Sequence, residues 1–362
     1  MELPSEIIEA DQALHRLYER ISFSRYLNPT NIMEARQAFK EGFEAPPFEY
    51  LQADWAEEEI AMLDSLVVPA THPFGILLID AIASTRLYME ALSLRTADVF
   101  DELAVRANWY PDASLIQAAQ AEVRERDTAP FCLGAQELTQ HLRDALETRG
   151  LIDWKVDLDS VMSARVLVDG AKRLLRVNSR ARFRERDVAK LIVHEVEVHA
   201  IRAANGDQQP LRMFGTGLPG ALETEEGLAL LAEERSATAA PGGGWRQGVV
   251  VRAIDWAREM GFRELFERIC EAGGESLAWG ISLRLKRGLK APEKPGVYAK
   301  DVVYYKGLKR VRAWLDAGNP VEHLFVGKVG IEHPVAEWLE EGLLDLKPVP
   351  QVFLSEGEPA VR

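Results

Sequence analysis

The chain has 362 residues, of which 47% are hydrophobic, and carries a formal net charge of -14. This composition predicts a globular protein and argues against a general nucleic-acid binder, which needs clustered Lys and Arg to neutralise phosphates. Cys132 and Cys270 are too few and too scattered for a disulfide framework. No signal peptide and no apolar run near the ~20 residues of a membrane span is recognisable, so we expect a cytoplasmic protein with no membrane partner.

Residues 1–125 predict a mostly helical N-terminal region. Apolar residues recur at helical spacing after Ser5, a plausible N-cap. Asn31 and Glu34 are placed like a capping pair at the start of the next helix. The apolar stretch from 74 to 94 predicts a longer and well-buried helix.

The hydrophobic pattern changes to alternation after a further predicted helix at 136–148. Segments 154–158, 164–168 and 174–177 alternate as strands do, and Asp169-Gly170 is typical of a tight turn between the last two. We therefore expect a small antiparallel sheet. Its edge could accept an extended peptide as an additional strand, but a purely structural hairpin explains the pattern equally well.

The sheet leads into a helix, expected at 185–204, that carries His194-Glu195-x-x-x-His199. In the usual His-Glu-x-x-His motif, both histidines lie on one face of a helix. Here the histidines are five positions apart, which rotates the second by about 140° from the face of the first on a regular α-helix. Both rings can point at one ion only if the helix widens, so the spacing predicts a one-residue π-bulge between them.

A second acidic motif, Thr224-Glu225-Glu226-Gly227-Leu228-Ala229, begins 25 residues after His199. We expect Thr224 to cap a helix, with both glutamates in its first turn, where the helix dipole favours acidic side chains for purely structural reasons. One of them as a metal ligand is the preferred interpretation. Two imidazoles and one carboxylate leave the fourth position of a zinc ion open for water, and Glu195 would then be the general base.

The rest of the chain predicts helices at about 246–259, 262–272, 275–287, 301–317 and 334–342. Pro241-Gly242-Gly243-Gly244 follows a helix rather than a strand, so we interpret it as a linker and not a phosphate loop. Between 281 and 312, ten Lys or Arg residues stand against Glu293 and Asp301 alone. This basic segment should face an anionic group.

These motifs resemble a known family, the bacterial "QEGLA motif" proteins, named for an inferred link to flavohaemoglobin expression, and their eukaryotic relatives, the microtubule-associated tyrosine carboxypeptidases. The resemblance extends from Asn28-Pro29-Thr30-Asn31 through Gln208-Gln209-Pro210 and Arg284-x-Lys286-Arg287-Gly288 to Lys300-Asp301-x-x-Tyr304. It implies that His194, His199 and Glu226 bind one Zn²⁺ per chain and that Glu195 is catalytic. Glu225 stands where the bacterial motif has Gln.

The expected fold is α+β and mostly helical, with a helical N-terminal region (1–125), a zinc metallopeptidase catalytic domain (126–350) and a C-terminal tail (351–362). Within the catalytic domain, the small antiparallel sheet leads into a zincin-like metal helix. The expected activity is that of a zinc metallocarboxypeptidase that removes a C-terminal residue from peptides or proteins. The eukaryotic relatives imply an aromatic or hydrophobic residue in that position. The oligomeric state is not predicted.

Two further roles follow from the chemistry of such a reaction. Tyr304, with Tyr298 behind it, is the candidate donor to the developing oxyanion, although the helical stripe that it shares with Leu308 and Val311 also fits core packing. The terminal carboxylate needs a cation. The candidates are Arg284, Lys286, Arg287 and Lys300, each of which would otherwise be part of a solvated helix face.

Two alternatives remain open from the sequence. Dipeptidyl peptidase III also uses His-Glu-x-x-x-His, but such an exopeptidase needs an acidic patch for the free amine of its substrate. A non-catalytic regulatory protein with a structural zinc would close the site with a fourth protein ligand. His323 and His333 are too far away in sequence to suggest one.

Overall fold

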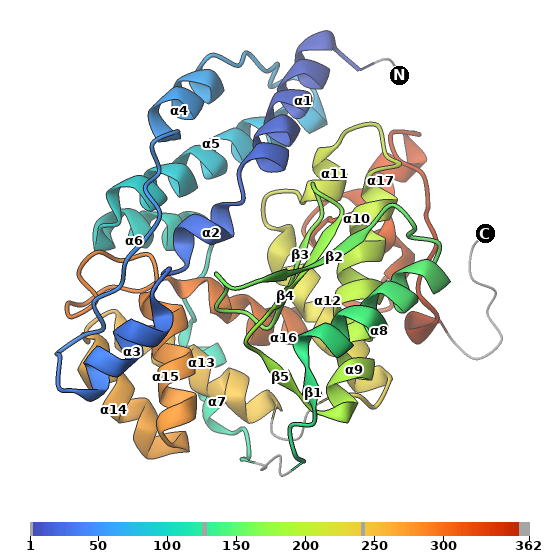
Figure 1. The fold of residues 1–362 in the computed structure, drawn as a ribbon. Helices are drawn as coiled ribbons and strands as arrows, with labels where there is room; N and C mark the ends of the chain where they lie inside the picture. Colours follow the sequence, from blue (N-terminus) through green and yellow to red (C-terminus); the bar gives the residue numbers. More distant parts are fainter. Residues whose placement is uncertain (1–2, 125–128, 240–242, 355–362) are drawn as a thin grey trace.

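The computed structural model describes residues 3–124, 129–239 and 243–354. Within these ranges the fold is mostly helical with two small sheets, as expected for the α+β class (Figure 1). None of the described helices is both long and apolar enough to cross a membrane.

The first third of the chain is helical, as predicted. Its helices are α1 (Ser5–Arg20), α2 (Phe23–Leu27), α3 (Ile32–Lys40), α4 (Ala56–Asp64), α5 (Pro73–Leu94), α6 (Ala97–Arg106) and α7 (Ala113–Gln120). The capping pair is wrong, because the Asn31 side chain binds the backbone of Pro47 and Glu49 instead of the helix. Helix α5 is buried on one face only, and Ile76 on its other face is 58% exposed.

The three predicted strands form one sheet, but the sheet is mixed rather than antiparallel. Its strands are β2 (Lys155–Asp159), β3 (Val166–Asp169) and β4 (Leu174–Asn178), in the order β2-β4-β3. β4 lies between the other two, antiparallel to β3 and parallel to β2. Alternation shows which face of a strand is buried and says nothing about strand direction, so the sequence pattern could not distinguish these arrangements.

The predicted two-residue turn after β3 is a longer connection, in which Arg173 adopts a φ of 48°. A second, two-stranded sheet pairs β1 (Leu133–Gly134) with β5 (Arg182–Phe183), and α8 (Ala135–Thr148) follows β1 directly.

The motif helix widens over more residues than expected. It begins as α9 (Glu185–Leu191), continues as a nine-residue π-helix, η1 (Ile192–Ala200), and ends as α10 (Ile201–Gly206). The prediction of π geometry between the histidines is confirmed, with a complete π-helical segment in place of a one-residue bulge.

After α11 (Met213–Thr216), helix α12 (Ala221–Arg235) carries the second acidic motif. The predicted cap at Thr224 is wrong, because α12 begins three residues earlier. The Thr224 hydroxyl instead accepts a hydrogen bond from the Ile331 amide at 3.0 Å. Both glutamates are therefore buried one turn inside the helix, where the helix dipole does not account for them.

The remaining predicted helices are confirmed with small shifts of their ends. They are α13 (Gly243–Ala257), α14 (Phe262–Gly273), α15 (Glu275–Lys286), α16 (Val302–Asp316) and α17 (Val335–Glu340), with 3₁₀ turns η2 (Ala299–Asp301), η3 (Val321–Phe325) and η4 (Gln351–Phe353). Of the predicted glycine-rich linker, residues 241–242 lie outside the described residues, whereas Gly243 and Gly244 belong to α13.

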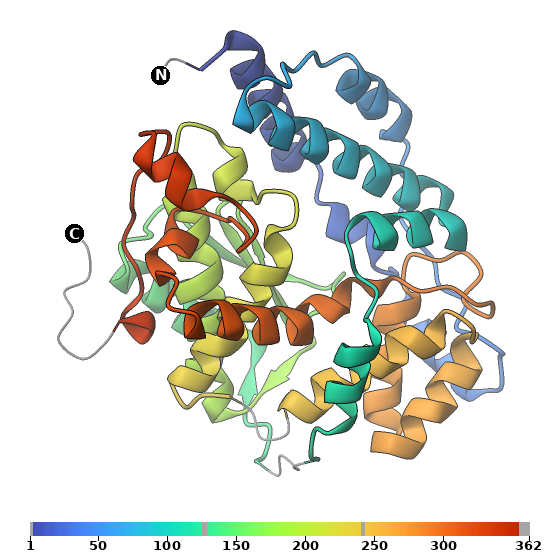
Figure 2. The same ribbon diagram turned by 180° about the vertical axis from the view of Figure 1, so that it is seen from behind.

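Helix α16 runs horizontally across the middle of Figure 2. It extends from the side of the molecule that holds the strands to the side that holds helices α13–α15. It packs on α12 and α13. The largest apolar cluster joins Ile7 and Phe74 of the N-terminal region with Phe214 and Trp338 of the later chain. These two parts of the chain therefore share one core.

The boundary predicted between residues 125 and 126 lies outside the described residues, so the domain division stays a prediction. Of the predicted tail, only residues 351–354 are described, and Phe353 packs there against Phe325.

The C-terminal segment 324–348 is held to α10 by hydrogen bonds from buried side chains. The Arg202 guanidinium donates to the carbonyl groups of Leu324 and Val329. The Asn205 amide donates to the carbonyl groups of Phe325 and Pro348. Arg202 is fully buried, so this segment packs over α10, the last part of the motif helix.

Candidate active site

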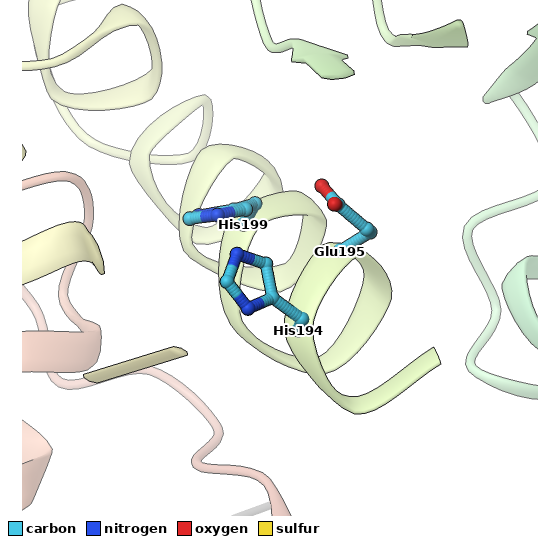
Figure 3. Close-up of side chains that lie close together, drawn as sticks. All are labelled: His194, Glu195 and His199. Atoms are coloured by element: carbon cyan, nitrogen blue, oxygen red, sulfur yellow. The ribbon is translucent and has the colours of Figure 1, made fainter. Parts of the chain in front are cut away.

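The π-helix η1 brings the motif side chains together. His194, Glu195 and His199 project from neighbouring turns of this helix, with the two rings beside each other (Figure 3). The ring centroids are 4.8 Å apart, and one potential ligand atom from each of the three residues lies within 4.8 Å of the others. Residues five apart share a face because a π-helix bonds i to i+5.

Helix α12 adds the fourth group, Glu226. Its Oε2 atom lies 3.6 Å from Nε2 of His194 and 3.6 Å from Nε2 of His199. The same oxygen is buried and has no hydrogen-bond partner among the described residues. Leaving a buried carboxylate oxygen unsatisfied is costly, so this geometry fits a cation held between the three side chains. Two imidazoles and a carboxylate are a donor set that suits zinc.

The other nitrogen of each histidine is fixed by a second carboxylate. Nδ1 of His194 lies 2.7 Å from Glu233, and Nδ1 of His199 lies 2.8 Å from Glu225. Such contacts orient the rings and leave the Nε2 atoms free to act as ligands.

Sequence reasoning missed this role for both residues. Glu233 had a usable signal, because it lies seven positions after Glu226 and therefore on the same face of α12.

Three cations, of which Arg202 is fully buried, pair with the two orienting glutamates. Glu225 pairs with Arg202 and, at 3.1 Å, with Lys328, while Lys190 lies 3.3 Å from Glu233. Burial opposes charge on Glu225, but Arg202 and Lys328 hold its pKa well below the usual range.

The ionisable groups of the site are strongly coupled. Burial disfavours the protonated ring of His194, but the neighbouring carboxylates of Glu226 and Glu233 raise its pKa to about 10. Burial raises the pKa of the Glu195 carboxyl. A carboxyl group with a raised pKa is a suitable proton acceptor and donor in hydrolysis at neutral pH.

These side chains line a cavity of about 210 Å³. It collects nearly all of the site residues predicted from the sequence: His194, Glu195, His199, Glu226, Arg284, Arg287, Tyr298, Lys300 and Tyr304. Residues 166–168 of the edge strand β3 line it as well. An extended peptide could therefore lie along this edge.

Lys286 does not belong to the site, so its predicted role in carboxylate binding is wrong. Its side chain is fully buried, and its ammonium group lies within hydrogen-bond distance of four backbone carbonyl oxygens, those of Ala257, Met260, Lys294 and Gly296. The position is structural, because this one side chain joins α13 to the loop before η2.

The other predicted cations differ in their partners. Arg284 makes a bidentate ion pair with Asp301. Arg287 donates to Asn28 and Ser163. Lys300, by contrast, has no acidic or hydrogen-bonding partner in the part of the chain that the structure describes. The same is true of the Tyr304 hydroxyl.

Comparison with known proteins defines the class. The model of the microtubule-associated tyrosine carboxypeptidase family matches residues 97–359. The chain therefore belongs to this family.

Among its relatives, microtubule-associated tyrosine carboxypeptidase 1 of Mus musculus is 28% identical over 209 residues, which are 55% of this chain and 43% of the relative. The putative tyrosine carboxypeptidase MATCAP2 of Homo sapiens is 28% identical over 159 residues, which are 41% of this chain and 29% of the relative. The matched segments thus span less than half the length of these relatives. The resemblance to the eukaryotic proteins is confirmed, and the bacterial subfamily stays a prediction.

Proposed function

We propose that the chain is a zinc metallocarboxypeptidase that removes a C-terminal aromatic or hydrophobic residue from peptides or proteins. The observation that carries the proposal is the Glu226 oxygen, which has no hydrogen-bond partner among the described residues and lies equally far from two histidine nitrogens. Its cavity also holds Glu195 and Lys300. The printed names of the relatives support a carboxypeptidase and suggest tyrosine as the residue removed.

His194, His199 and Glu226 would hold the zinc, which supplies an activated water and polarises the scissile carbonyl when bound. Glu195 accepts the proton of the attacking water and passes it to the leaving amine. The Tyr304 hydroxyl donates to the oxyanion that develops on the carbonyl oxygen. Burial raises the pKa of Tyr304 well above 10, so the hydroxyl keeps its proton at neutral pH.

The surroundings of the cavity favour this proposal over the two alternatives. A dipeptidyl peptidase needs acidic groups for a free amine, whereas this cavity is lined by Lys300, a cation that has no acidic partner among the described residues. A closed structural zinc site needs a fourth protein ligand. Neither His323 nor His333 lines the cavity, and the His333 Nδ1 atom accepts a hydrogen bond from the Gly330 amide.

Mass spectrometry of a peptide library with free and amidated C-termini tests the proposal. Zinc-loaded protein is expected to remove single C-terminal residues from the free peptides only. The Glu195→Gln variant should lose about 10²- to 10⁴-fold in rate, the contribution of a general base.

Glu197→Gln is the matched control, because Glu197 lies on the same π-helix but pairs with Arg149 outside the cavity. Its rate should stay close to that of the parent protein. Cleavage within the peptide or from the N-terminus, or equal activity of both variants, would refute the assignment.

A further inference from the structure

A second and larger cavity adjoins the first. Its volume is about 810 Å³, and it shares four lining residues with the catalytic cavity: Tyr88, Leu222, Tyr298 and Lys300. These four side chains therefore stand where the two spaces meet. A substrate residue next to the scissile bond can extend from the catalytic cavity into this space.

Lys300 differs from every other cation of the catalytic cavity. The other four have an acidic partner at 3.8 Å or less: Arg176 with Asp169, Arg284 and Arg287 with Asp301, and Lys328 with Glu225. Asp301 is the acidic partner of both arginines among the described residues, so Arg284, Arg287, Asp301 and Lys300 together carry an excess of two positive charges. A partly buried cation without a counter-ion favours an anionic ligand.

The cations of the second cavity are likewise neutralised, apart from the shared Lys300. The pairs, at 3.1 Å or less, are Arg106 with Asp80, Lys306 with Glu223, and Arg310 with Glu223 and Glu332. Lys300 is therefore the one cation lining either cavity that has no acidic partner among the described residues.

We propose that the second cavity is the subsite for the C-terminal residue of the substrate and that Lys300 binds the terminal carboxylate. This inference rests on the proposed function. The terminal carboxylate lies one residue, about 3.8 Å of backbone, beyond the scissile carbonyl. The cation that binds it must therefore line the cavity of His194 and Glu195, as Lys300 does.

The walls of the second cavity indicate the side chain that it accepts. Tyr18, Phe23 and Trp109 line it together with the shared tyrosines, and the Trp109 ring meets Tyr298 edge to face at 5.7 Å. Aromatic side chains prefer such edge-to-face contacts. With every cation except Lys300 paired to an acidic group, the space suits an aromatic or apolar terminal residue rather than an acidic one.

Peptide binding separates this proposal from catalysis. In the Glu195→Gln background, calorimetry compares acetyl-Ala-Ala-Tyr with a free carboxylate and the same peptide as its amide. We expect the free acid to bind at least about 10-fold more tightly, the value of one charge-assisted hydrogen bond. Adding Lys300→Met should abolish that difference, and adding Lys300→Arg should retain most of it.

Lys309→Met is the matched control, because Lys309 is 42% exposed and pairs with Glu122 outside both cavities. It should keep the full preference for the free acid. A preference that survives Lys300→Met, or equal binding of acid and amide by the parent, overturns the role of Lys300. A thermal unfolding scan of each variant verifies folding.

The side-chain subsite has its own test in the catalytically active protein. Leu222→Trp narrows the junction, so the ratio of kcat/KM for Tyr-ended over Ala-ended peptides should fall at least about 10-fold. The Ala-ended peptide is the internal control, and an unchanged ratio refutes the subsite. Absence of all cleavage, together with a Lys300-dependent preference in binding, refutes the proposed function and leaves the carboxylate site standing.

Discussion

Tyr304 is the residue whose assignment depends most on the three-dimensional structure. Tyr304 is half-buried and lines the cavity of the proposed active site, and its hydroxyl has no hydrogen-bond partner among the described residues. A tyrosine that served packing alone would be expected to pair its hydroxyl inside the protein. Tyr304→Phe should lower kcat by about 10²- to 10³-fold, the usual effect of removing one oxyanion donor, and leave KM nearly unchanged. Steady-state kinetics on a free-acid peptide measure both constants.

The neighbouring Tyr305→Phe is the control for this substitution. The Tyr305 hydroxyl donates to Glu122 at 2.8 Å and does not line the cavity. Its kcat should match that of the parent, and a Tyr304→Phe enzyme with parental kcat would exclude the tyrosine from the reaction.

His333 lies outside the cavity of the proposed active site and is expected to make the stability of the protein depend on pH. Burial lowers its pKa from the usual histidine value of about 6.5 to about 4. The unfolded chain therefore binds the proton more readily, so this stabilisation is complete above pH 6.5 and is lost as pH falls towards 4. The free energy of unfolding, measured with urea across this pH range, should therefore fall by about 3 kcal/mol less in His333→Gln than in the parent. Parallel pH profiles for the two proteins would contradict the prediction.

At the residue scale, the sequence predicted which side chains form the proposed catalytic centre better than it predicted the nearby cations. The histidines, Glu195 and Glu226 converge as their motif spacing indicated. A basic run, however, does not tell which of its members face one side. Arg284 and Lys286 are two positions apart on α15, hence about 200° around the helix, so they point in opposite directions.

Among the elements, α12 and α16 make the closest approach that bears on the site. A Cβ atom at Gly227 would lie 2.4 Å from the carbonyl carbon of Gly307. Backbone atoms cannot move aside cheaply, so Gly227→Ala should destabilise the protein by about 1 to 3 kcal/mol. The measurement is the free energy of unfolding from denaturant titration. Gly227 follows Glu226 directly, so Gly227→Ala should also displace Glu226 and weaken the binding of zinc.

Gly280→Ala should change the free energy of unfolding in the opposite direction and is the control for Gly227→Ala. Gly280 lies inside α15, and a Cβ there would meet no atom within 4 Å. Alanine in a helix interior is about 0.5 to 1 kcal/mol better than glycine, so this variant should be more stable than the parent. A destabilised Gly280→Ala, or a neutral Gly227→Ala, would show that the packing argument is wrong.

Most helices could be predicted from the sequence, because apolar residues recur at helical spacing along them and capping residues or glycines mark their ends. Two kinds of feature could not. The parallel pairing of β2 with β4 depends on how the chain returns, which alternation does not record. The nine-residue extent of η1 is the second, because the five-residue spacing indicated only that some widening was required, and the contacts of η1 with α12 and β3 are not visible in the sequence.

For the whole molecule, the proposed zinc site joins two separate helices, η1 and α12. A ligand that binds only the folded state stabilises it by mass action, about 2.7 kcal/mol at a concentration 100-fold above Kd. Removal of zinc with a chelator should therefore lower Tm, and added zinc should restore it. Differential scanning calorimetry of the chelated and reloaded protein measures the shift.

Glu226→Gln is the variant that links this shift to the site. It removes the charged ligand, so its Tm should respond little to zinc or to chelator. A parent protein whose Tm is indifferent to zinc, or a variant that shows the full shift, would contradict a metal held between the two helices.

The hydrogen bonds from Arg202 and Asn205 to the segment 324–348 have a consequence for how the protein folds during its synthesis. Synthesis proceeds from the N-terminus, and domains generally begin to fold during it. While residues 324–348 are still inside the ribosome, Arg202 lacks the carbonyl groups that hold it, and Glu225, which orients His199, lacks both Arg202 in place and Lys328. A nascent chain therefore emerges with its proposed peptidase centre unfinished, and competence comes only when translation has passed this segment.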